Sequence, residues 1–332
     1  MRHHLNGSSI LVILISVTLV FAALVSVVTF KYDLHTNSHV TAAWNMEVEL
    51  IYRYFWTKTF GSWELYAAFA IVFVAQQFIP AQDSHDSVRH IKIDLIWTFV
   101  WIANMCLFMP LYWYGLKTTA APLIDWVRQL QISLPKWQVI VLGYFVADFL
   151  GWFHHLIRHK ILLFWEFHKI HHSQTFMNPL TVTRVHPFDQ FIARTIKLLP
   201  TVFFKDGLSI AIGYMFFHEL QDRLVHSNIK SNWGWLRYVL VTPQSHRVHH
   251  SGEKEYYDKN FGVSFSIWDH LFGTQCKDYN VYPTTGVPDP NFPCETKVKG
   301  SLFKVVMLQL IYPITRCRKM IFRSEKQAIP LE

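Results

Sequence analysis

The sequence predicts an all-α integral membrane protein in which four transmembrane helices precede a histidine-rich helical region on the cytosolic side. Three observations support this fold class. Of the 332 residues, 51% are hydrophobic and 16% are charged, whereas soluble domains carry roughly 25% charged residues. Four stretches are apolar over spanning or nearly spanning lengths. Thirteen of the 19 histidines lie after position 153, beyond the last of these stretches.

The first expected span covers residues 8–30 and contains no charged residue. Its 23 residues would form a helix of roughly 34 Å, enough to cross a hydrocarbon core of about 30 Å. A cleaved signal peptide is the alternative, but its apolar core is usually roughly 7–15 residues long. Moreover, Phe30-Lys31-Tyr32 is a poor cleavage site. We therefore expect a retained membrane anchor.

The other expected spans cover residues 65–79, 95–115 and 137–153, and tryptophan and tyrosine residues lie near their ends, as is typical of membrane interfaces. Residues 191–204 and 207–217 are shorter or more charged, which favours helices in the interface or a hairpin. The proline-containing segment 251–293 is expected to form loops and surface structure.

The charge distribution predicts the orientation. Residues 1–153 contain nine Lys/Arg and nine Asp/Glu, whereas residues 154–332 contain 22 and 14, so the net charge of +8 arises in the second part. With four spans and a cytosolic N-terminus, this basic part also lies in the cytosol, in agreement with the positive-inside rule, and residues 31–63 lie on the opposite side. The basic residues are scattered among aromatic ones, which favours an anionic membrane surface over nucleic acid as a partner.

The cysteine positions exclude several kinds of site. The four cysteines, at 106, 276, 294 and 317, form no Cys-x-x-Cys pair. This excludes a zinc ribbon, a thioredoxin-type redox motif, a cysteine-bound iron–sulfur cluster and a disulfide scaffold.

The clustered histidines carry the chemical signal. The pattern His-x-x-His-His occurs at 168–172 and again at 246–250, and two further histidines lie four residues apart at 155 and 159. On a helix this spacing places the imidazoles on one face. Packed imidazoles are costly to protonate and poorly satisfied when neutral, so the pattern predicts metal binding. Such ligands suit iron, zinc, copper or nickel, and eight or more nitrogens can hold two metals with open coordination positions.

A family resemblance extends over residues 80–275, in a series of motifs that occur in a fixed order. These are Asp148–His159, Trp165–Ser173, Asn178-Pro-Leu-Thr, Arg184-Val-His186-Pro187, His226-Ser-Asn, Pro243–Ser251, Asn260-Phe-Gly and Trp268–Thr274. Together they resemble the membrane-bound fatty acid hydroxylase/sterol desaturase superfamily. We expect residues 80–275 to be the catalytic domain, residues 1–79 an N-terminal anchor and connecting region, and residues 276–332 a C-terminal tail.

The resemblance implies a histidine-ligated di-iron oxygenase in the endoplasmic reticulum membrane of a eukaryote or the inner membrane of a bacterium. Carried over by position, its metal ligands are His155, His159, His168, His171, His172, His226, His246, His249 and His250. Some relatives have a histidine where this chain has Asp222, so His186, His218 and Asp222 are candidates for a tenth ligand. Acidic residues that would orient the ligands through their second ring nitrogen are Asp148, Glu166, Asp189, Asp258 and Asp269.

The implied reaction uses O2 and two external electrons to oxidise a lipid C–H bond. Hydroxylation is favoured over desaturation because residues 243–274 look closer to the hydroxylase members. The chain shows no dinucleotide-binding glycine pattern, so we expect electrons from a b-type cytochrome or a ferredoxin with its reductase, docked on the basic region. Two weaker alternatives are a histidine-rich metal or electron carrier and a membrane zinc hydrolase, whose signature fails because His218-Glu-x-x is followed by Asp222.

Overall fold

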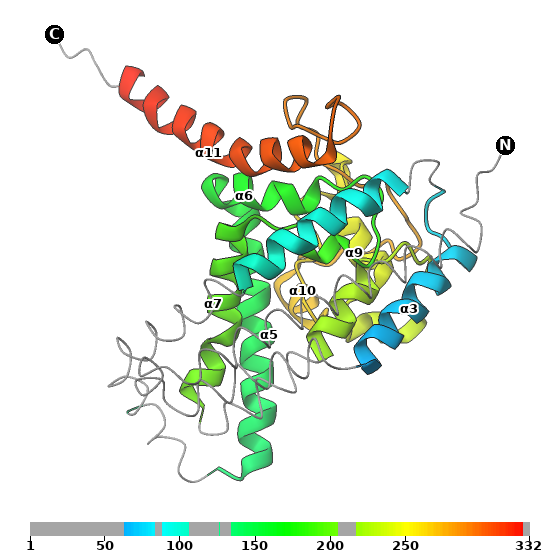
Figure 1. Cartoon of the computed structure of the whole chain (residues 1–332). Coiled ribbons are helices and arrows are strands. Elements are labelled where there is room, and N and C mark those ends of the chain that lie inside the picture. Colours follow the sequence, from blue (N-terminus) through cyan, green and yellow to red (C-terminus); the bar gives the residue numbers. More distant parts are fainter. Residues whose placement is uncertain (1–62, 84–87, 106–125, 127–133, 205–216, 328–332) are drawn as a thin grey trace, which may run out of the picture.

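The structure is a computed structural model that describes residues 63–83, 88–105, 126, 134–204 and 217–327 (Figure 1). Within these residues the regular elements are helices, and extended segments pair only through isolated bridges such as Pro80 with Ile229. This confirms the expected all-α fold class for the part of the chain that is described. The main helices are α3 (Trp63–Phe78), a helix over 88–105, α5 (Lys136–Lys160), α6 (Leu162–His172), α7 (Pro187–Phe203), a helix over 217–225, α9 (Pro243–His249), α10 (Ile267–Phe272) and α11 (Leu302–Gln327).

Helix α5 runs through much of the length of the fold (Figure 1). Among the described helices it alone is long and apolar enough to cross a membrane, judged by length and composition. One side of α5 exposes Trp137, Val141, Leu142 and Phe145, while the opposite side is buried against the rest of the protein. The span expected over residues 137–153 lies within this helix.

The other expected spans have different outcomes. Residues 65–79 coincide with α3, whose 16 residues make it a shorter apolar helix. Residues 95–105 belong to the helix over 88–105, whose Trp97 and Trp101 are buried, and residues 106–115 lie outside the described part of the chain. Residues 8–30 also lie outside it, as do residues 205–216. The segment 251–293 is mainly turns, interrupted by α10 and a short 3-10 turn at Lys254–Tyr256.

A sharp corner at the end of α5 brings the histidines together. Ile161 adopts an extended conformation between α5 and α6, so the chain turns and α6 crosses the end of α5. Helix α7 packs along α5, and α11 packs on α6 (Figure 1). The last turns of α5 and the buried, histidine-bearing end of α6 therefore lie close together.

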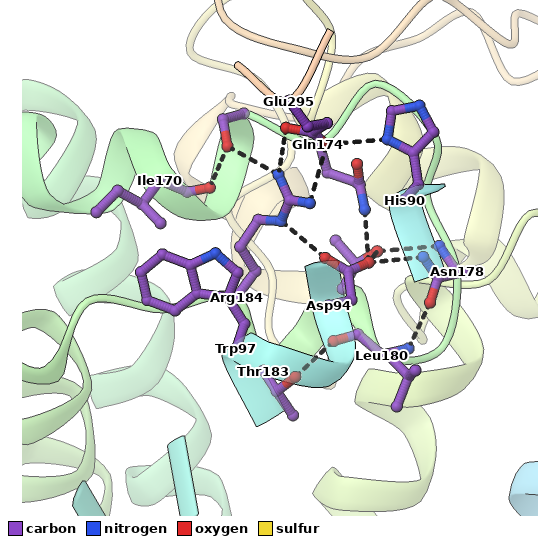
Figure 2. Close-up of polar contacts among 12 residues, drawn as sticks. His90, Asp94, Trp97, Ile170, Gln174, Asn178, Leu180, Thr183, Arg184 and Glu295 are labelled. Carbon is purple, nitrogen blue, oxygen red and sulfur yellow. Dashed lines mark hydrogen bonds and ion pairs between the residues drawn. The ribbon is translucent and has the colours of Figure 1, made fainter. Parts of the chain in front are cut away.

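The C-terminal segment, residues 276–327, is joined to the helical core by a buried ionic network (Figure 2). Arg184 donates from Nε to Asp94 at 2.8 Å and from its terminal nitrogen to Glu295 at 3.0 Å. Nδ1 of His90 lies 2.9 Å from a carboxylate oxygen of Glu295, and the side-chain amide of Asn178 donates to Asp94 at 2.7 Å. All five side chains are buried. The network connects the helix over 88–105, the segment after α6 and the C-terminal segment.

Apolar packing strengthens the same junction. Phe292, Val305 and Val306 of the C-terminal segment form one buried cluster with Trp97 of the helix over 88–105 and Ile170 of α6. Trp97 also donates a hydrogen bond through its indole nitrogen to Gln309 of α11, at 3.0 Å. Part of the apolar content of residues 95–105 thus serves the protein core.

Candidate metal centre

Nine histidines gather in two adjacent groups, and the potential ligand atoms within each group lie within 4.8 Å of one another. They are the nine that the sequence resemblance assigns as ligands. The five-histidine group consists of His155, His159, His168, His172 and His249, and the four-histidine group consists of His171, His226, His246 and His250.

Two helices contribute to both groups. Helix α6 supplies His171 to one group and His172 to the other, because successive residues on a helix point about 100° apart. Helix α9 does the same with His246 and His249. The rings of His172 and His250 stack with their centroids 4.2 Å apart, so the two groups share a boundary. The sequence pattern His-x-x-His-His thereby builds a double site rather than two separate ones.

The start of α9 is fixed by strong local signals. Thr242 and Ser245 form a reciprocal capping box, and Pro243 occupies the first helical position, where its missing N–H costs no hydrogen bond. Asn260 donates to the backbone carbonyl of Ser245 at 2.9 Å. These contacts hold the seven-residue helix in place although it is too short to be stable alone.

The Nε2 atoms face one another at distances that suit a shared metal ion. The Nε2 atom of His226 lies 3.1 Å from that of His171 and 2.9 Å from that of His246. In the other group, the Nε2 atoms of His168 and His172 are 3.2 Å apart. Two nitrogens bound to one metal at about 2.1 Å and at right angles lie about 3.0 Å apart, so this spacing fits metal ligation.

The outer ring nitrogens of His155 and His249 each contact a backbone acceptor. The Nδ1 atom of His155 donates to the carbonyl of Phe261 at 3.0 Å, and that of His249 donates to the carbonyl of Lys259 at 2.9 Å. A neutral imidazole carries one proton, so its Nε2 is then an unprotonated lone pair. The Nε2 atoms of His155, His159 and His249 are buried and have no hydrogen-bond partner among the described residues. Because no hydrogen bond among the described residues satisfies these buried lone pairs, they suit the coordination of a metal ion.

Two carboxylates support the ligands in the same way. Asp189 lies 2.9 Å from Nδ1 of His168, and Asp222 lies 3.2 Å from Nδ1 of His226. Arg158, which is buried, is 3.3 Å from Asp189 and balances its charge. The sequence reading did not single out Arg158, although its place directly before His159 was the available signal.

Burial favours the neutral form of most of the grouped imidazoles. Burial, reinforced by neighbouring imidazoles, lowers the pKa values of five group members well below the usual 6.5, and burial lowers the pKa of His249 to about 3. The five are His168, His171, His172, His246 and His250. Neutral imidazole is the form that binds metal, so no proton has to be displaced at neutral pH.

The candidates for a tenth ligand lie outside both groups. His186 caps α7, where its Nδ1 accepts from the backbone N–H of Phe188 at 3.1 Å. His218 contacts Lys197 at 2.8 Å and Asp222 at 3.5 Å. Burial and the charge of Lys197 lower the pKa of His218 to about 3. Asp222 contacts the grouped histidine His226 at Nδ1, the ring nitrogen that does not take part in the close Nε2 contacts of the group. His154 also belongs to neither group.

Asp148 and Asp269 hold backbone segments instead of histidines. Asp148 accepts from the backbone N–H of Ser264 at 2.9 Å and from the indole of Trp268 at 2.8 Å. Asp269 accepts from the backbone N–H of Phe261 at 2.8 Å. It therefore supports His155 indirectly, through the residue whose carbonyl that histidine contacts.

Glu166 and Asp258 form ion pairs at the edge of the site. Glu166 pairs with Lys169 at 2.9 Å, and Asp258 pairs with Lys160 at 2.6 Å on the surface. The described contacts of both acids therefore place them beside the metal centre rather than behind its ligands.

The fold and the site define a class of protein, namely a helical protein with two adjacent all-imidazole groups that could each hold a metal ion. Residues 140–274 match the family described as fatty acid hydroxylase, and they include all nine grouped histidines. This match covers less than half of the chain, and it supports the resemblance to the fatty acid hydroxylase superfamily that the sequence motifs indicated.

Curated relatives agree with the family. Alkylglycerol monooxygenase of Caenorhabditis elegans is 32% identical over 130 residues, which are 39% of this chain and 25% of the relative. Ornithine lipid hydroxylase OlsE of Rhizobium tropici is 27% identical over 194 residues, 57% of this chain and 55% of the relative. Very-long-chain aldehyde decarbonylase GL1-4 of Oryza sativa subsp. japonica is 25% identical over 138 residues, 38% and 21% of the two chains. The matches thus span between about a fifth and about half of these relatives, and no solved structure matches the chain significantly.

Proposed function

We propose that this protein is a membrane-bound oxidoreductase that uses O2 and external electrons to hydroxylate an aliphatic C–H bond of a lipid. The observation that carries the proposal is the pair of adjacent histidine groups, in which Nε2 atoms converge at metal-ligand spacing within the segment that matches the fatty acid hydroxylase family. Two of the relatives named above are a monooxygenase and a hydroxylase, which supports the reaction type.

The five-histidine and four-histidine groups would each hold one iron ion. Two bound iron ions would supply the redox chemistry that activates O2, since imidazole suits iron and leaves coordination positions open. The overall reaction converts a C–H bond, O2, two electrons and two protons into an alcohol and water. The electrons come from a separate b-type cytochrome or ferredoxin with its reductase.

The protein's own residues position the ligands and exclude water. Asp189 and the carbonyl of Phe261 fix the orientation of His168 and His155, so the inward nitrogens keep their lone pairs. The ring of Trp165 packs 4.9 Å from that of His159 and covers the five-histidine group. Such a covered, preorganised site limits side reactions of a reactive oxidant with water.

The membrane placement of the chain is part of the proposal. The exposed apolar side of α5 would face lipid, with the histidines at its C-terminal end on the cytosolic side. A multi-pass topology with spans near 8–30, 65–79, 95–115 and 137–153 would place the enzyme in the endoplasmic reticulum or in a bacterial inner membrane. The excess of basic residues after position 153 would form the docking surface for an acidic electron donor.

Desaturation is the second candidate reaction, because the same centre performs either outcome depending on how a second hydrogen is placed. Purified, reduced protein supplied with lipid extract and isotopically labelled O2 distinguishes the two. We expect label in a new hydroxyl group, and a new double bond in unlabelled product would favour desaturation. The His171→Ala variant should form neither product, and His270→Ala, altered outside both groups, should retain activity.

A further inference from the structure

A cavity of about 470 Å³ lies beside the five-histidine group. Its inner wall includes His159, His172 and His249 and no member of the four-histidine group. Cavities of this size commonly enclose small organic ligands. A molecule held there would therefore approach the metal centre from the five-histidine side.

The outer wall of this cavity comes from the C-terminal segment, which lies beyond the family match at residues 140–274. Residues 286–291 and Arg316 form this wall. It is attached directly to the histidine region, because the N–H of Gly286 donates to the carbonyl of His250 at 3.1 Å. Gly286 has a φ of +133°, a backbone conformation that favours glycine, and a Cβ atom there would lie 3.2 Å from the side chain of Thr175.

Four charged side chains lie together where the cavity meets α11. Lys169 lies 2.9 Å from Glu166 and 2.9 Å from Asp289. Arg316 approaches Glu166 at 3.6 Å through its Nε, which has no hydrogen-bond partner among the described residues. Tyr312 donates to Asp289 at 2.8 Å. Two cations therefore face two carboxylates, and the set carries no net charge.

Apart from Asp258, whose charge is balanced by Lys160 at 2.6 Å, the rest of the lining is largely apolar. Leu162, Val287, Pro288 and Pro290 line the cavity together with Trp165, whose ring also packs on His159 and His172. The cavity thus has imidazoles at its inner wall, a balanced ionic cluster near α11, and apolar side chains on its walls. This arrangement suits a molecule with a polar end and an apolar chain.

We propose that this cavity binds the head group of the lipid substrate and that it selects a head group without net charge. The inference rests on the proposed function in taking the bound molecule to be a lipid. A neutral or zwitterionic head group accepts a hydrogen bond from Nε of Arg316 and donates to Glu166 and Asp289, whose carboxylates can each accept several. An anionic head group would add an uncompensated charge to a balanced, mostly buried cluster, which is unfavourable.

Photo-crosslinking of the metal-free, full-length protein tests this proposal without requiring turnover. The probe is a monoalkyl glycerol ether with a diazirine on the carbon next to the head group. We expect labelled peptides to contain residues 162–169, 286–291 or Arg316. Unlabelled lipids with the same chain and a glycerol or phosphoethanolamine head, both of which carry hydrogen-bond donors, should compete about tenfold better than one with a carboxylate head.

Matched variants of α11 complete the test. Arg316→Met should lower the labelling yield about tenfold by removing a charge-assisted hydrogen bond, and Asp289→Asn should also lower it. Lys319→Met, on the exposed side of the same helix, should leave it unchanged. Labelling confined to other peptides, equal labelling of Arg316→Met and the parent chain, or stronger competition by the carboxylate lipid would overturn the assignment. Absence of lipid hydroxylation alongside this labelling pattern would instead contradict the proposed function alone.

Discussion

Replacing Arg184 with methionine should destabilise the protein strongly, although Arg184 lies outside both histidine groups. Its guanidinium is fully buried and binds Asp94 at 2.8 Å and Glu295 at 3.0 Å (Figure 2). Methionine fills similar space but leaves both carboxylates buried without their cation. The C-terminal segment would lose its main polar attachment to the helix over 88–105.

The expected loss of stability depends on the contacts that the two carboxylates keep in the variant. Asp94 keeps hydrogen bonds from Gln174 and Asn178, and Glu295 keeps its contact with His90. Removing one partner of a buried ion pair costs about 3–5 kcal/mol. This corresponds to a fall of roughly 6–20 °C in the unfolding midpoint of a large domain.

Glu295→Gln should cost less than Arg184→Met, about 1–2 kcal/mol, because it removes a charge and leaves Asp94 and Arg184 balanced. The variant should also respond differently to acid. Although burial raises it, Arg184 lowers the pKa of Glu295 below its usual value. The stability that Glu295 contributes is thus present above pH about 4.3 and lost as pH falls through the lowered pKa, a loss that Glu295→Gln lacks.

Thermal unfolding of the detergent-purified protein measures these effects. The matched control is Lys160→Met, which removes the ion pair with Asp258. That pair is shorter, at 2.6 Å, but its side chains are 52% and 45% exposed, so we expect at most about 1 kcal/mol. The reasoning fails if Arg184→Met lowers the free energy of unfolding by less than about 1 kcal/mol, or if Lys160→Met lowers it by more than Arg184→Met does.

Three further predictions concern the site, the orientation and the electron donor. Asp189→Asn should weaken metal binding about 10–100-fold, because His168 loses its charged acceptor; chelator competition measures this, and unchanged affinity would exclude the supporting role. Single cysteines introduced at positions 40 and 285 of a cysteine-free chain should differ in labelling by a membrane-impermeant reagent in sealed cells, and equal protection would contradict the four-span orientation. Donor-dependent turnover should fall as salt rises from about 0.05 to 0.5 M, and an unchanged rate would exclude docking on the basic region.

The local histidine patterns were predictable because helical spacing alone places His155 near His159 and His168 near His172. The side chains that connect the helices to distant parts of the chain were not predictable. Asp94, Arg184 and Glu295 are far apart in sequence, and no local pattern relates them, so the network appears only once the chain is folded.

The apolar content of residues 95–105 illustrates a second limit of the sequence. It predicted lipid contact, whereas Trp97 is buried against the C-terminal segment, because hydropathy does not distinguish a lipid-facing side chain from a protein-facing one. The cavity was not predictable from the sequence either. Its outer wall lies in a segment outside the recognised motifs, where no pattern indicated a role in the site.

The metal content of the purified protein tests the double centre most directly. Elemental analysis should find close to two iron ions per chain. His249→Ala and His171→Ala, one from each group, should each retain about one, and His270→Ala should retain two. A single ion in the parent chain, or unchanged content in both His249→Ala and His171→Ala, would contradict the assignment of one metal to each histidine group.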